Sequence, residues 1–320
     1  MGRAGVQVSE VGLGCWQLGR EWGDVSETAA RAVLDAALDA GVTFLDTADV
    51  YGDGRSEQFI GDLRARRSER PFVATKLGRR LGYPDGYSYE VFRESVQRSL
   101  RNLRCDTLDL VQLHCIPKPW LERPETFGWL RRLRDEGLIR HYGASVETIE
   151  EGLVCLEDAE LASLQVIFNV FRQRPAETLL ARARAAGVAI IARLPLASGL
   201  LGGHIDAQTR FDPSDHRHFN ADGQAFSVGE TFSGLGQARG VQASARVAEL
   251  CPPDMSRAEF ALRWILDHEA VTVVIPGART PAQVRSNAAA SERPSLSTET
   301  HARLRTIYET EVEPFIRGPQ

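Results

Sequence analysis

Three short apolar segments of this chain each carry a side chain that can hold a charge or exchange a proton. Asp46 interrupts the segment TFLDTAD, and Tyr51 follows it by five residues. Lys76 follows FVAT, and His114 closes LVQLH. An isolated buried ion costs several kcal/mol or more in free energy. If these segments are buried strands, Asp46 and Lys76 are therefore expected to pair with each other.

Together the four residues suit proton transfer to a carbonyl oxygen. The pKa of an isolated phenol is about 10, and an adjacent ammonium lowers it by stabilising the phenolate, so Lys76 would make Tyr51 a better acid. Asp46 would keep Lys76 charged, and His114 could hydrogen-bond the same substrate oxygen. Protein side chains do not donate hydride, so the hydride would come from a nicotinamide cofactor.

Other interpretations of the same residues stay open. Asp46 and Lys76 could form a purely structural ion pair. His114 could be a core histidine with both nitrogens satisfied, and Tyr51 could serve packing alone. Lys76 is also one of two lysines among 38 basic residues. Because only an ammonium readily forms a Schiff base, a lyase that uses Lys76 as its nucleophile is a further hypothesis.

The segments that carry these residues belong to an alternation that runs along the whole chain. Short apolar runs rich in β-branched residues, typical of buried strands, are each followed by a stretch with helical spacing. Eight strands are expected, over residues 11–16, 43–49, 72–77, 108–114, 141–146, 164–170, 188–196 and 271–277. Helices are expected to begin near Ser26, Ser88, Pro124, Pro175 and Ser256.

This alternation predicts an α/β fold of parallel strands joined by crossover helices. Eight units predict a closed (β/α)8 TIM barrel, a single domain over residues 1–320, with a long polar loop after strand seven (residues 204–240) and a C-terminal helical segment. A doubly wound fold would need a GxGxxG turn, and none occurs in the sequence. Because the C-terminal ends of neighbouring barrel strands carry the chemistry, Asp46, Lys76 and His114 should converge.

The composition argues against several kinds of partner. Of 320 residues, 38 are basic and 43 acidic, which gives a net charge of −5, so a nucleic acid partner is not expected. No apolar run reaches the ~20 residues that a membrane span needs, and the first residues lack the features of a secretory signal. The five cysteines are scattered and form no CxxC pair, which predicts reduced thiols in a cytoplasmic protein. Assembly into a homo-oligomer is left open.

Seven ordered motifs extend these observations over nearly the whole chain: VGLGCWQLG, FLDTADVYGDGRSEQFIG, ATK, DLVQLH, YGAS, PLASGLLGG and VIPGARTPAQVRSN. In this order they resemble the aldo-keto reductase superfamily, and the IPG of the last motif resembles its bacterial, potassium-channel β-subunit-like branch. The resemblance implies a (β/α)8 barrel that binds NADPH (NADP⁺) without a Rossmann domain. It also implies a catalytic tetrad of Asp46, Tyr51, Lys76 and His114, with Tyr51 as the proton donor.

The same resemblance implies cofactor contacts along the chain. Ser145 and Gln165 match positions that bind the nicotinamide carboxamide. Arg279 is the expected partner of the 2′-phosphate, because a guanidinium matches phosphate geometry, although it could also be a solvated surface side chain. The full set of expected cofactor contacts is Cys15, Trp16, Asp46, Ser145, Gln165, Arg193, Pro195, Leu196, Ser198, Gly199, Leu200, Arg217, Gly277, Arg279, Gln283 and Asn287.

Two of the departures from the family pattern lie at positions expected to contact the nicotinamide. Val146 stands where many members have an Asn after the Ser of strand five, so one amide contact to the nicotinamide is missing. Arg193 stands where an aromatic side chain usually stacks on the nicotinamide. A guanidinium can also stack on a ring, but it adds a charge beside the cofactor. Whether Arg193 stacks or binds an acidic or polyhydroxylated substrate stays open.

The substrate is expected to be a small molecule held at the catalytic end of the barrel. The expected substrate contacts are Trp16, Trp22, Tyr51, His114 and Trp120, although the three tryptophans could equally pack the rim. In the long loop, FDPSDHRHFN lacks the spacing of a zinc site, so no metal is expected. That loop is interpreted as a lid from which Arg217 reaches a phosphate, or else as a solvated segment.

The sequence therefore predicts an NADPH-dependent oxidoreductase that reversibly reduces an aldehyde or ketone to an alcohol, with hydride from the nicotinamide and a proton from Tyr51. The alternative is an NADPH-binding redox-sensing or regulatory subunit with slow turnover, which the channel-subunit resemblance allows. Turnover with a panel of aldehydes separates the two hypotheses.

Overall fold

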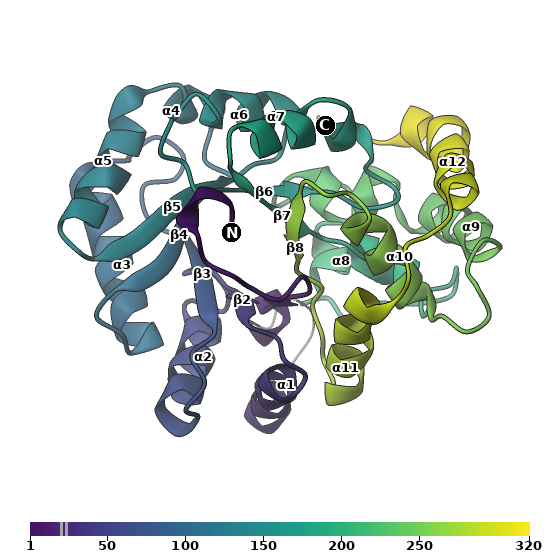
Figure 1. The fold of residues 1–320 in the computed structure, drawn as a ribbon, viewed down its shortest axis with the longest axis horizontal. Coiled ribbons are helices and arrows are strands. Elements are labelled where there is room, and N and C mark those ends of the chain that lie inside the picture. Colours follow the sequence, from purple (N-terminus) through teal and green to yellow (C-terminus); the bar gives the residue numbers. More distant parts are fainter. Residues whose placement is uncertain (20–21, 23–24) are drawn as a thin grey trace.

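Eight strands pair in the order in which they occur along the chain in a computed structural model that describes residues 1–19, 22 and 25–320 (Figure 1). Every neighbouring pair is parallel. Bridges from Val11 to Val274 and from Gly14 to Gly277 join the first and last strands and close the barrel. The strands are β1 (Leu13–Gly14), β2 (Phe44–Asp46), β3 (Phe72–Leu77), β4 (Leu108–His114), β5 (Ile139–Ser145), β6 (Ser163–Ile167), β7 (Ala189–Arg193) and β8 (Val271–Val274). The predicted (β/α)8 barrel is confirmed.

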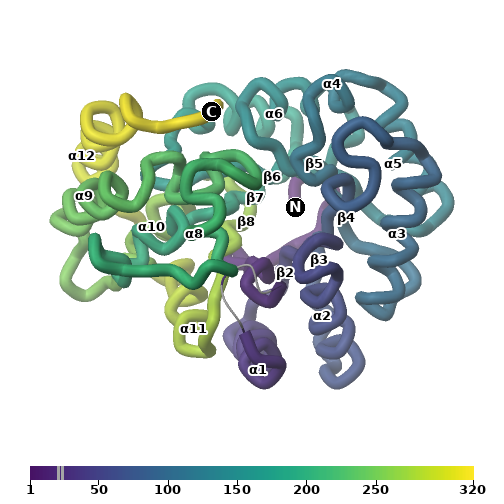
Figure 2. Tube along the Cα trace, turned by 180° about the vertical axis from the view of Figure 1, so that it is seen from behind, coloured from purple at the N-terminus to yellow at the C-terminus, as the bar shows by residue number. Residues whose placement is uncertain are grey.

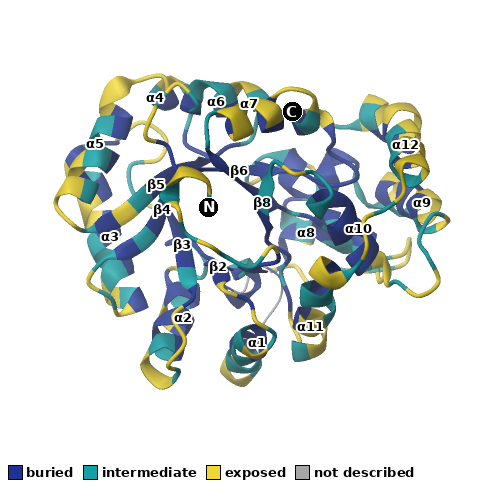
Figure 3. Ribbon diagram, in the orientation of Figure 1, coloured by how far each residue is buried: buried dark blue, intermediate teal, exposed yellow. Residues whose placement is uncertain are grey.

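Helices surround the barrel and turn their exposed faces outward, while the strands are almost wholly buried (Figure 3). The helices of the described residues are α1 (Glu27–Asp39), α2 (Arg55–Arg66), α3 (Tyr89–Leu103), α4 (Lys118–Leu121), α5 (Pro124–Asp135), α6 (Ile149–Cys155), α7 (Leu179–Ala185), α8 (His216–Phe219), α9 (Gln237–Ala248), α10 (Arg257–Leu266), α11 (Pro281–Ala289) and α12 (Thr298–Ile307). Their amphipathic sequences place one apolar face on the strands.

The start signals that the sequence contains account for several helix positions. Ser26, Ser88 and Ser256 each accept a hydrogen bond from a backbone N–H in the first turn of α1, α3 and α10. Pro124 is the first residue of α5. The predicted start at Pro175 is wrong: Pro175 lies in a short 3₁₀ turn, and α7 begins four residues later because the backbone leaves the helical region at Thr178.

The register of the sheet brings polar side chains together on neighbouring strands. Gly14 pairs with Asp46, and Lys76 pairs with Gln112. Ser145 lies between its partners His114 and Gln165 on the flanking strands. Side chains on paired positions of parallel strands point to the same face. The end of the barrel at which the strands finish therefore gathers these polar groups.

The opposite end of the barrel is closed by the N-terminal segment. Phe44, Ala74, Leu110, Ile191, Val273 and Ile275 form an apolar cluster inside the barrel, against which Met1, Val8 and Phe72 pack. Figure 1 shows the N-terminus at the centre of the ring of strands. In the described part of the chain, the cavity that could admit a ligand lies at the C-terminal end of the strands.

The predicted long loop after strand seven is confirmed, and it is packed on the barrel. It contains α8 and two short 3₁₀ turns (Val228–Glu230 and Phe232–Gly234) before α9 begins at Gln237. The ring of His216 in α8 lies 4.7 Å from that of Trp16 and 4.3 Å from that of Trp22. Figure 2 shows α8 from behind, beside the labels of β7 and β8. No helix in the described part of the chain is long and apolar enough to cross a membrane.

Candidate active site

The four residues singled out from the strand ends meet at the C-terminal end of the barrel. The Nζ atom of Lys76 lies 2.5 Å from Oδ1 of Asp46, and it also donates to the Thr47 carbonyl at 2.8 Å and to the Tyr51 hydroxyl at 3.3 Å. The ring of His114 stands edge-on to that of Tyr51 at 5.9 Å. Lys76 and Asp46 are buried, so they form the buried ion pair that the sequence predicts.

The expectation that Lys76 lowers the pKa of Tyr51 is not met. Desolvation by burial, with the nearby carboxylates of Asp46 and Glu230, raises the pKa of Tyr51 well above its usual value. The hydroxyl is therefore a neutral phenol at neutral pH. Lys76 acts on it as a hydrogen-bond donor, which orients the oxygen and stabilises negative charge that develops there.

His114 is also neutral. Burial and the surrounding cations Arg79, Lys76 and Arg193 hold the pKa of His114 well below its usual value. Its Nδ1 atom is buried and has no hydrogen-bond partner among the described residues. A neutral imidazole in this position can donate one hydrogen bond to a substrate oxygen without placing a charge beside it.

Asp46 connects this group to the next strands. Its second carboxylate oxygen accepts a hydrogen bond of 2.6 Å from the side-chain amide of Gln165, at the centre of β6. The amide oxygen of Gln165 remains as an acceptor, and the Ser145 hydroxyl lies on the adjacent strand in register with it. The two side chains thus offer an acceptor and a hydroxyl side by side, which suits recognition of a carboxamide.

A cavity of about 800 Å³ lies over these residues and extends to α11. It brings together most of the predicted site. The predicted residues that line it are Trp16, Trp22, Asp46, Tyr51, His114, Ser145, Gln165, Arg193, Pro195, Leu196, Ser198, Gly199, Arg217, Gly277, Arg279, Gln283 and Asn287. Lys76 lies beneath the surface of the cavity and is 1% exposed. With three acceptors already on its ammonium, Lys76 is poorly placed to attack a substrate as a Schiff-base lysine.

Three predicted contacts do not line the cavity. The backbone of Cys15 is already used, because its N–H donates to the Asp46 carbonyl and its carbonyl accepts from the Ser56 hydroxyl. Leu200 turns into the core, where it packs against Gly240. Trp120 packs its ring on Tyr87 and Trp129 on the outer side of the barrel.

Arg217 reaches the cavity, but its charge is already paired. Its guanidinium makes two hydrogen bonds to the Asp215 carboxylate, at 2.9 and 2.6 Å, and lies over the rings of Trp22 and Phe211. It also donates to the Ser198 carbonyl. These contacts hold the long loop against the cavity wall, so Arg217 serves to anchor the loop more than to offer a free cation.

The far end of the cavity is formed by two helix N-termini. Arg279 lies just before α11, Gln283 lies in its first turn and Asn287 lies further along it; the Gln283 side chain accepts from the Arg279 N–H at 2.8 Å. Arg257, which the sequence analysis does not single out, is the first residue of α10 and also lines the cavity. Neither Arg257 nor Arg279 has an ion-pair partner among the described residues. Two free guanidinium groups beside helix N-termini suit an anionic ligand group.

Gly277 shows how closely the elements approach at this cavity. A Cβ atom at this position would lie 1.9 Å from the end of the Gln17 side chain, so a larger residue would require that side chain to move. Gln17, a buried residue of the segment after β1, is itself part of the cavity wall. The glycine of the IPG motif thus allows the residues after β8 to pack closely against that segment.

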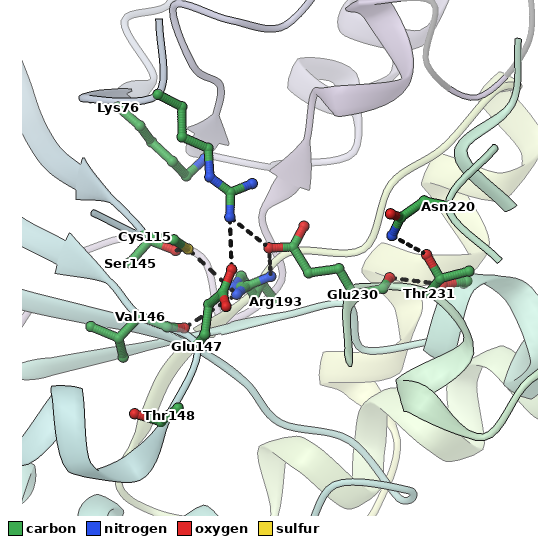
Figure 4. A network of polar contacts seen from close by, with 12 residues as sticks. Lys76, Cys115, Ser145, Val146, Glu147, Thr148, Arg193, Asn220, Glu230 and Thr231 are labelled. Carbon is green, nitrogen blue, oxygen red and sulfur yellow. Dashed lines mark hydrogen bonds and ion pairs between the residues drawn. The ribbon is translucent and has the colours of Figure 1, made fainter. Parts of the chain in front are cut away.

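A charged network beside Tyr51 also escapes the sequence analysis, apart from Arg193. Arg79 donates to Glu147 at 2.8 Å and to Glu230 at 3.2 Å. Arg193 lies 3.4 Å from the same Glu230 oxygen and donates to the Val146 carbonyl at 3.2 Å. Figure 4 shows Glu147, Arg193 and Glu230 pointing toward one another. Arg79 follows β3, Glu147 follows β5, and Arg193 and Glu230 lie at the end of β7 and in the long loop after it, so spacing in the sequence gives no sign of the cluster.

Residues 10–309 match the family model described as the aldo/keto reductase family. This chain belongs to the aldo/keto reductase family. The chain is similar to an uncharacterized oxidoreductase, YqkF, from Bacillus subtilis, with 32% identity over 93% of this chain and 92% of that protein.

Solved structures of aldo-keto reductases have the same fold. A glycerol dehydrogenase from Gluconobacter oxydans superposes with a TM-score of 0.78 at 29% identity, over 98% of this chain and 95% of its own. An aldo-keto reductase from Klebsiella pneumoniae in complex with NADPH superposes with a TM-score of 0.69 at 25% identity, over 95% and 94%. The resemblance drawn from the motifs is confirmed, and this protein is an aldo-keto reductase, an oxidoreductase by family.

Proposed function

We propose that this aldo-keto reductase binds NADPH and reversibly reduces an aldehyde or ketone to an alcohol, with Tyr51 as the proton donor. The observation that carries the proposal is the buried Lys76 ammonium, bound at once to Asp46 and to the Tyr51 hydroxyl at the floor of the cavity. An ammonium that donates to a phenol oxygen stabilises the negative charge left there when the proton moves to the substrate.

The cavity fits a dinucleotide. It is long enough to run from the strand ends to α11, and its volume of about 800 Å³ lies in the upper range of ligand sites. The loop between β7 and α8 that borders it holds Leu194, Ala197 and Ser198 in the left-handed backbone region, which L residues rarely adopt. Such strain clusters at ligand sites. The relative from Klebsiella pneumoniae that is described in complex with NADPH supports the same assignment.

Residues at the two ends of the cavity would bind the two ends of the cofactor. Ser145 and Gln165 would hold the carboxamide of the nicotinamide, and Arg279 and Arg257 would hold the phosphate at the adenosine end. Bound NADPH supplies the hydride that the protein's side chains lack. Preference for NADPH over NADH then depends on the two free guanidinium groups, since NADH lacks the 2′-phosphate that they would pair with.

This chain's own residues then handle the oxygen of the substrate. The neutral His114 imidazole donates a hydrogen bond to the carbonyl oxygen and fixes its direction. Tyr51 donates its hydroxyl proton to the same oxygen as negative charge develops there. Lys76 stabilises the phenolate that remains, and Asp46 keeps Lys76 charged and aimed. In the reverse direction the phenolate takes the proton of an alcohol.

The substrate would enter between aromatic side chains at the rim. Trp16 lies over Tyr51 with the rings 5.9 Å apart, and Trp22 and Phe226 continue this wall. Such a wall suits a small molecule with an apolar or flat body beside its carbonyl. The inner end of this substrate pocket lies at Tyr51, so the reacting carbon has to be near one end of the substrate molecule.

The experiment is a fluorescence titration of the purified protein with NADPH and with NADH, followed by steady-state rates of NADPH oxidation over a panel of aldehydes and ketones. Tight NADPH binding with oxidation by at least one carbonyl class is expected. Tight binding with no oxidation over the panel would favour the alternative, a redox-sensing or regulatory subunit with slow turnover. Absence of NADPH binding would contradict both.

A further inference from the structure

Arg193 points into the barrel at the level of the proposed nicotinamide site. It is the last residue of β7 and pairs with Ile167 of β6, two positions beyond the pairing of Ile191 with Gln165. Because side chains two residues apart in a strand share a face, Arg193 points the same way as Ile191, which lies in the apolar cluster inside the barrel. Its guanidinium therefore lies one layer above that cluster, at the mouth.

The contacts of Arg193 tie together the two departures from the family pattern. Its guanidinium donates to the carbonyl of Val146, the residue that stands in place of the usual Asn, and lies 3.7 Å from the Cys115 sulfur. Its Nε atom is buried without an acceptor among the described residues. Cys115 and Val146, which follow β4 and β5, therefore hold one end of the guanidinium in place, and the side chain stays buried.

The counter-ion of Arg193 comes from the long loop. Glu230 lies 3.4 Å from Arg193 and 3.2 Å from Arg79, and its side chain is 6% exposed. These two cations hold the pKa of Glu230 below its usual value in spite of its burial, so it is ionised. Ser198 fixes its backbone by donating to the Glu230 carbonyl.

The charges around the proposed nicotinamide site are balanced. Lys76 pairs with Asp46, while Arg79 and Arg193 face Glu147 and Glu230. The nicotinamide ring of NADP⁺ carries a positive charge and that of NADPH carries none, and the two cofactors are otherwise the same. A fixed cation beside the ring disfavours NADP⁺ alone, and a fixed anion favours it alone. The ratio of their two affinities therefore reports the local charge.

We propose that Arg193 biases this site toward the reduced cofactor and that Glu230, brought in by the long loop, limits the bias. An uncharged aromatic ring at the position of Arg193 would not discriminate between the two redox states by charge. With Arg193, the pair of charges sets the ratio of the dissociation constants for NADP⁺ and NADPH. This inference rests on the proposed NADPH function and concerns the redox preference of the same site.

Part of this cluster could instead bind a metal ion. Ligand atoms of Cys115, Glu147 and Glu230 lie within 4.8 Å of one another. However, Arg79 contacts both carboxylates and Arg193 contacts Glu230 and Cys115. A cation placed there would meet two fixed positive charges, so the geometry favours the role of a charge balance.

The experiment measures dissociation constants for NADP⁺ and NADPH, by calorimetry or fluorescence competition, on single charge variants. In Arg193→Gln the ratio of the NADP⁺ constant to the NADPH constant should fall about tenfold or more, and in Glu230→Gln it should rise about tenfold or more, because one charge at about 12 Å and an effective dielectric of about 20 changes the ratio about tenfold and a nearer charge changes it further. The double variant should return to within about threefold of the wild type, because the two changes cancel in charge. Each tenfold change in the ratio moves the midpoint potential of the bound couple by about 30 mV.

Two control variants separate charge from structure. Arg193→Lys keeps the charge and should leave the ratio within about twofold of the wild type. Arg257→Gln, at the far end of the cavity, should weaken both cofactors by the same factor and leave the ratio unchanged. A general disturbance of the site would instead move the ratio of Arg193→Gln and Glu230→Gln in the same direction.

Such parallel changes, or a ratio that stays within about twofold in both variants while NADPH still binds, would overturn the charge-balance inference and leave the proposed function standing. Failure of the wild-type protein to bind either cofactor would overturn the proposed function and the inference together.

Discussion

At the scale of single residues, the site depends on which groups are charged. Desolvation keeps Tyr51 a neutral phenol and His114 a neutral imidazole, while Lys76 and Asp46 form a buried ion pair. A neutral phenol is a proton donor, and the ammonium beside it stabilises the product of the donation. The rate of reduction is therefore expected to depend on Tyr51 much more strongly than cofactor binding does.

Tyr51→Phe tests this role. The variant keeps the ring between Trp16 and His114 and removes only the hydroxyl that accepts from Lys76. Turnover of a carbonyl substrate should fall about 100-fold or more, which is the range of general acid catalysis. The dissociation constant of NADPH should change less than about threefold. If cofactor binding is lost instead, Tyr51 belongs to the binding site and not to the proton path.

Asp49 carries a pH dependence of stability. It is 1% exposed, and neither carboxylate oxygen has a hydrogen-bond partner among the described residues. Burial, with the nearby Glu57 carboxylate, raises the pKa of Asp49 to about 7. Between about pH 4 and pH 7 the folded state holds a proton that the unfolded state has released. The contribution of Asp49 to stability is therefore present below about pH 4 and is lost as the pH rises to about 7.

Asp49→Asn removes this dependence. The difference in the free energy of unfolding, variant minus wild type, should be about 2–3 kcal/mol larger at pH 8 than at pH 5. The reason is that the wild type loses stability as Asp49 ionises, and each pKa unit corresponds to about 1.4 kcal/mol. Urea unfolding at the two pH values measures it. Asp53→Asn, at an exposed position of the same loop, is the control and should show no comparable difference. An equal effect of Asp49→Asn at both pH values would contradict a raised pKa.

Among the secondary structure elements, the starts of α10 and α11 determine the adenosine end of the cavity. The side chain of the N-cap Thr280 accepts from the Gln283 N–H in the first turn of α11, and the Gln283 side chain accepts from the N–H of Arg279, just before the helix. A phosphate there would be paired by a guanidinium and favoured by the helix dipole. NADH has no 2′-phosphate, so it cannot gain from this arrangement.

Arg279→Ala should raise the dissociation constant of NADPH about tenfold or more, because a hydrogen bond to a charged group contributes about 1.5–3 kcal/mol. The constant for NADH should stay within about twofold. Arg285→Ala on the same helix, at an exposed position outside the cavity lining, is the matched control and should change neither. An unchanged ratio of the two constants in Arg279→Ala would mean that another group reads the 2′-phosphate.

The sequence predicts the elements best where their signals are local. The predicted strand positions and the serine caps of α1, α3 and α10 are confirmed because hydrophobic runs and capping side chains act within a few residues. The start of α2 carries no such signal, since its N-cap is Gly54. The start of α6 does carry one, the capping box of Thr148 and Glu151, which the sequence analysis does not use.

The residues of the candidate site likewise differ in how well the sequence predicts them. Asp46, Lys76 and His114 are predicted because charged residues at the ends of apolar runs are conspicuous. Glu230 is not predicted, because it sits in a polar loop, where a charged residue is ordinary, and its ionic partners lie on distant strands. Cys15 and Leu200 lie outside the cavity lining for another reason: their places in motifs do not show that hydrogen bonds or core packing already occupy them.

For the whole molecule, the described residues place the cavity at one end of the barrel and an apolar cluster at the other. The N-terminal segment covers the apolar cluster at the other end with Met1 and Val8, so stability and function are assigned to opposite faces. Changes at the closed end should alter the free energy of unfolding and leave ligand binding intact.

Val8→Asp tests this separation. An unpaired carboxylate against the apolar cluster should lower the free energy of unfolding by about 1–3 kcal/mol. The dissociation constant of NADPH should stay within about twofold, because Val8 lies at the far end of the barrel from the cavity. Gln7→Asp, an exposed neighbour, should leave both quantities nearly unchanged. A large loss of cofactor affinity in Val8→Asp with the fold intact would contradict the division between the two faces.

The most direct test of the central claim follows the hydride itself. NADPH deuterated at the transferable C4 position is bound to the protein and mixed with a reactive aldehyde such as 4-nitrobenzaldehyde, and the alcohol is analysed by mass spectrometry. One deuterium on the carbinol carbon, formed by the wild type and nearly abolished in Tyr51→Phe, is the predicted result. Bound cofactor that yields no deuterated alcohol with any carbonyl tested, or equal yields from the wild type and Tyr51→Phe, would contradict the account.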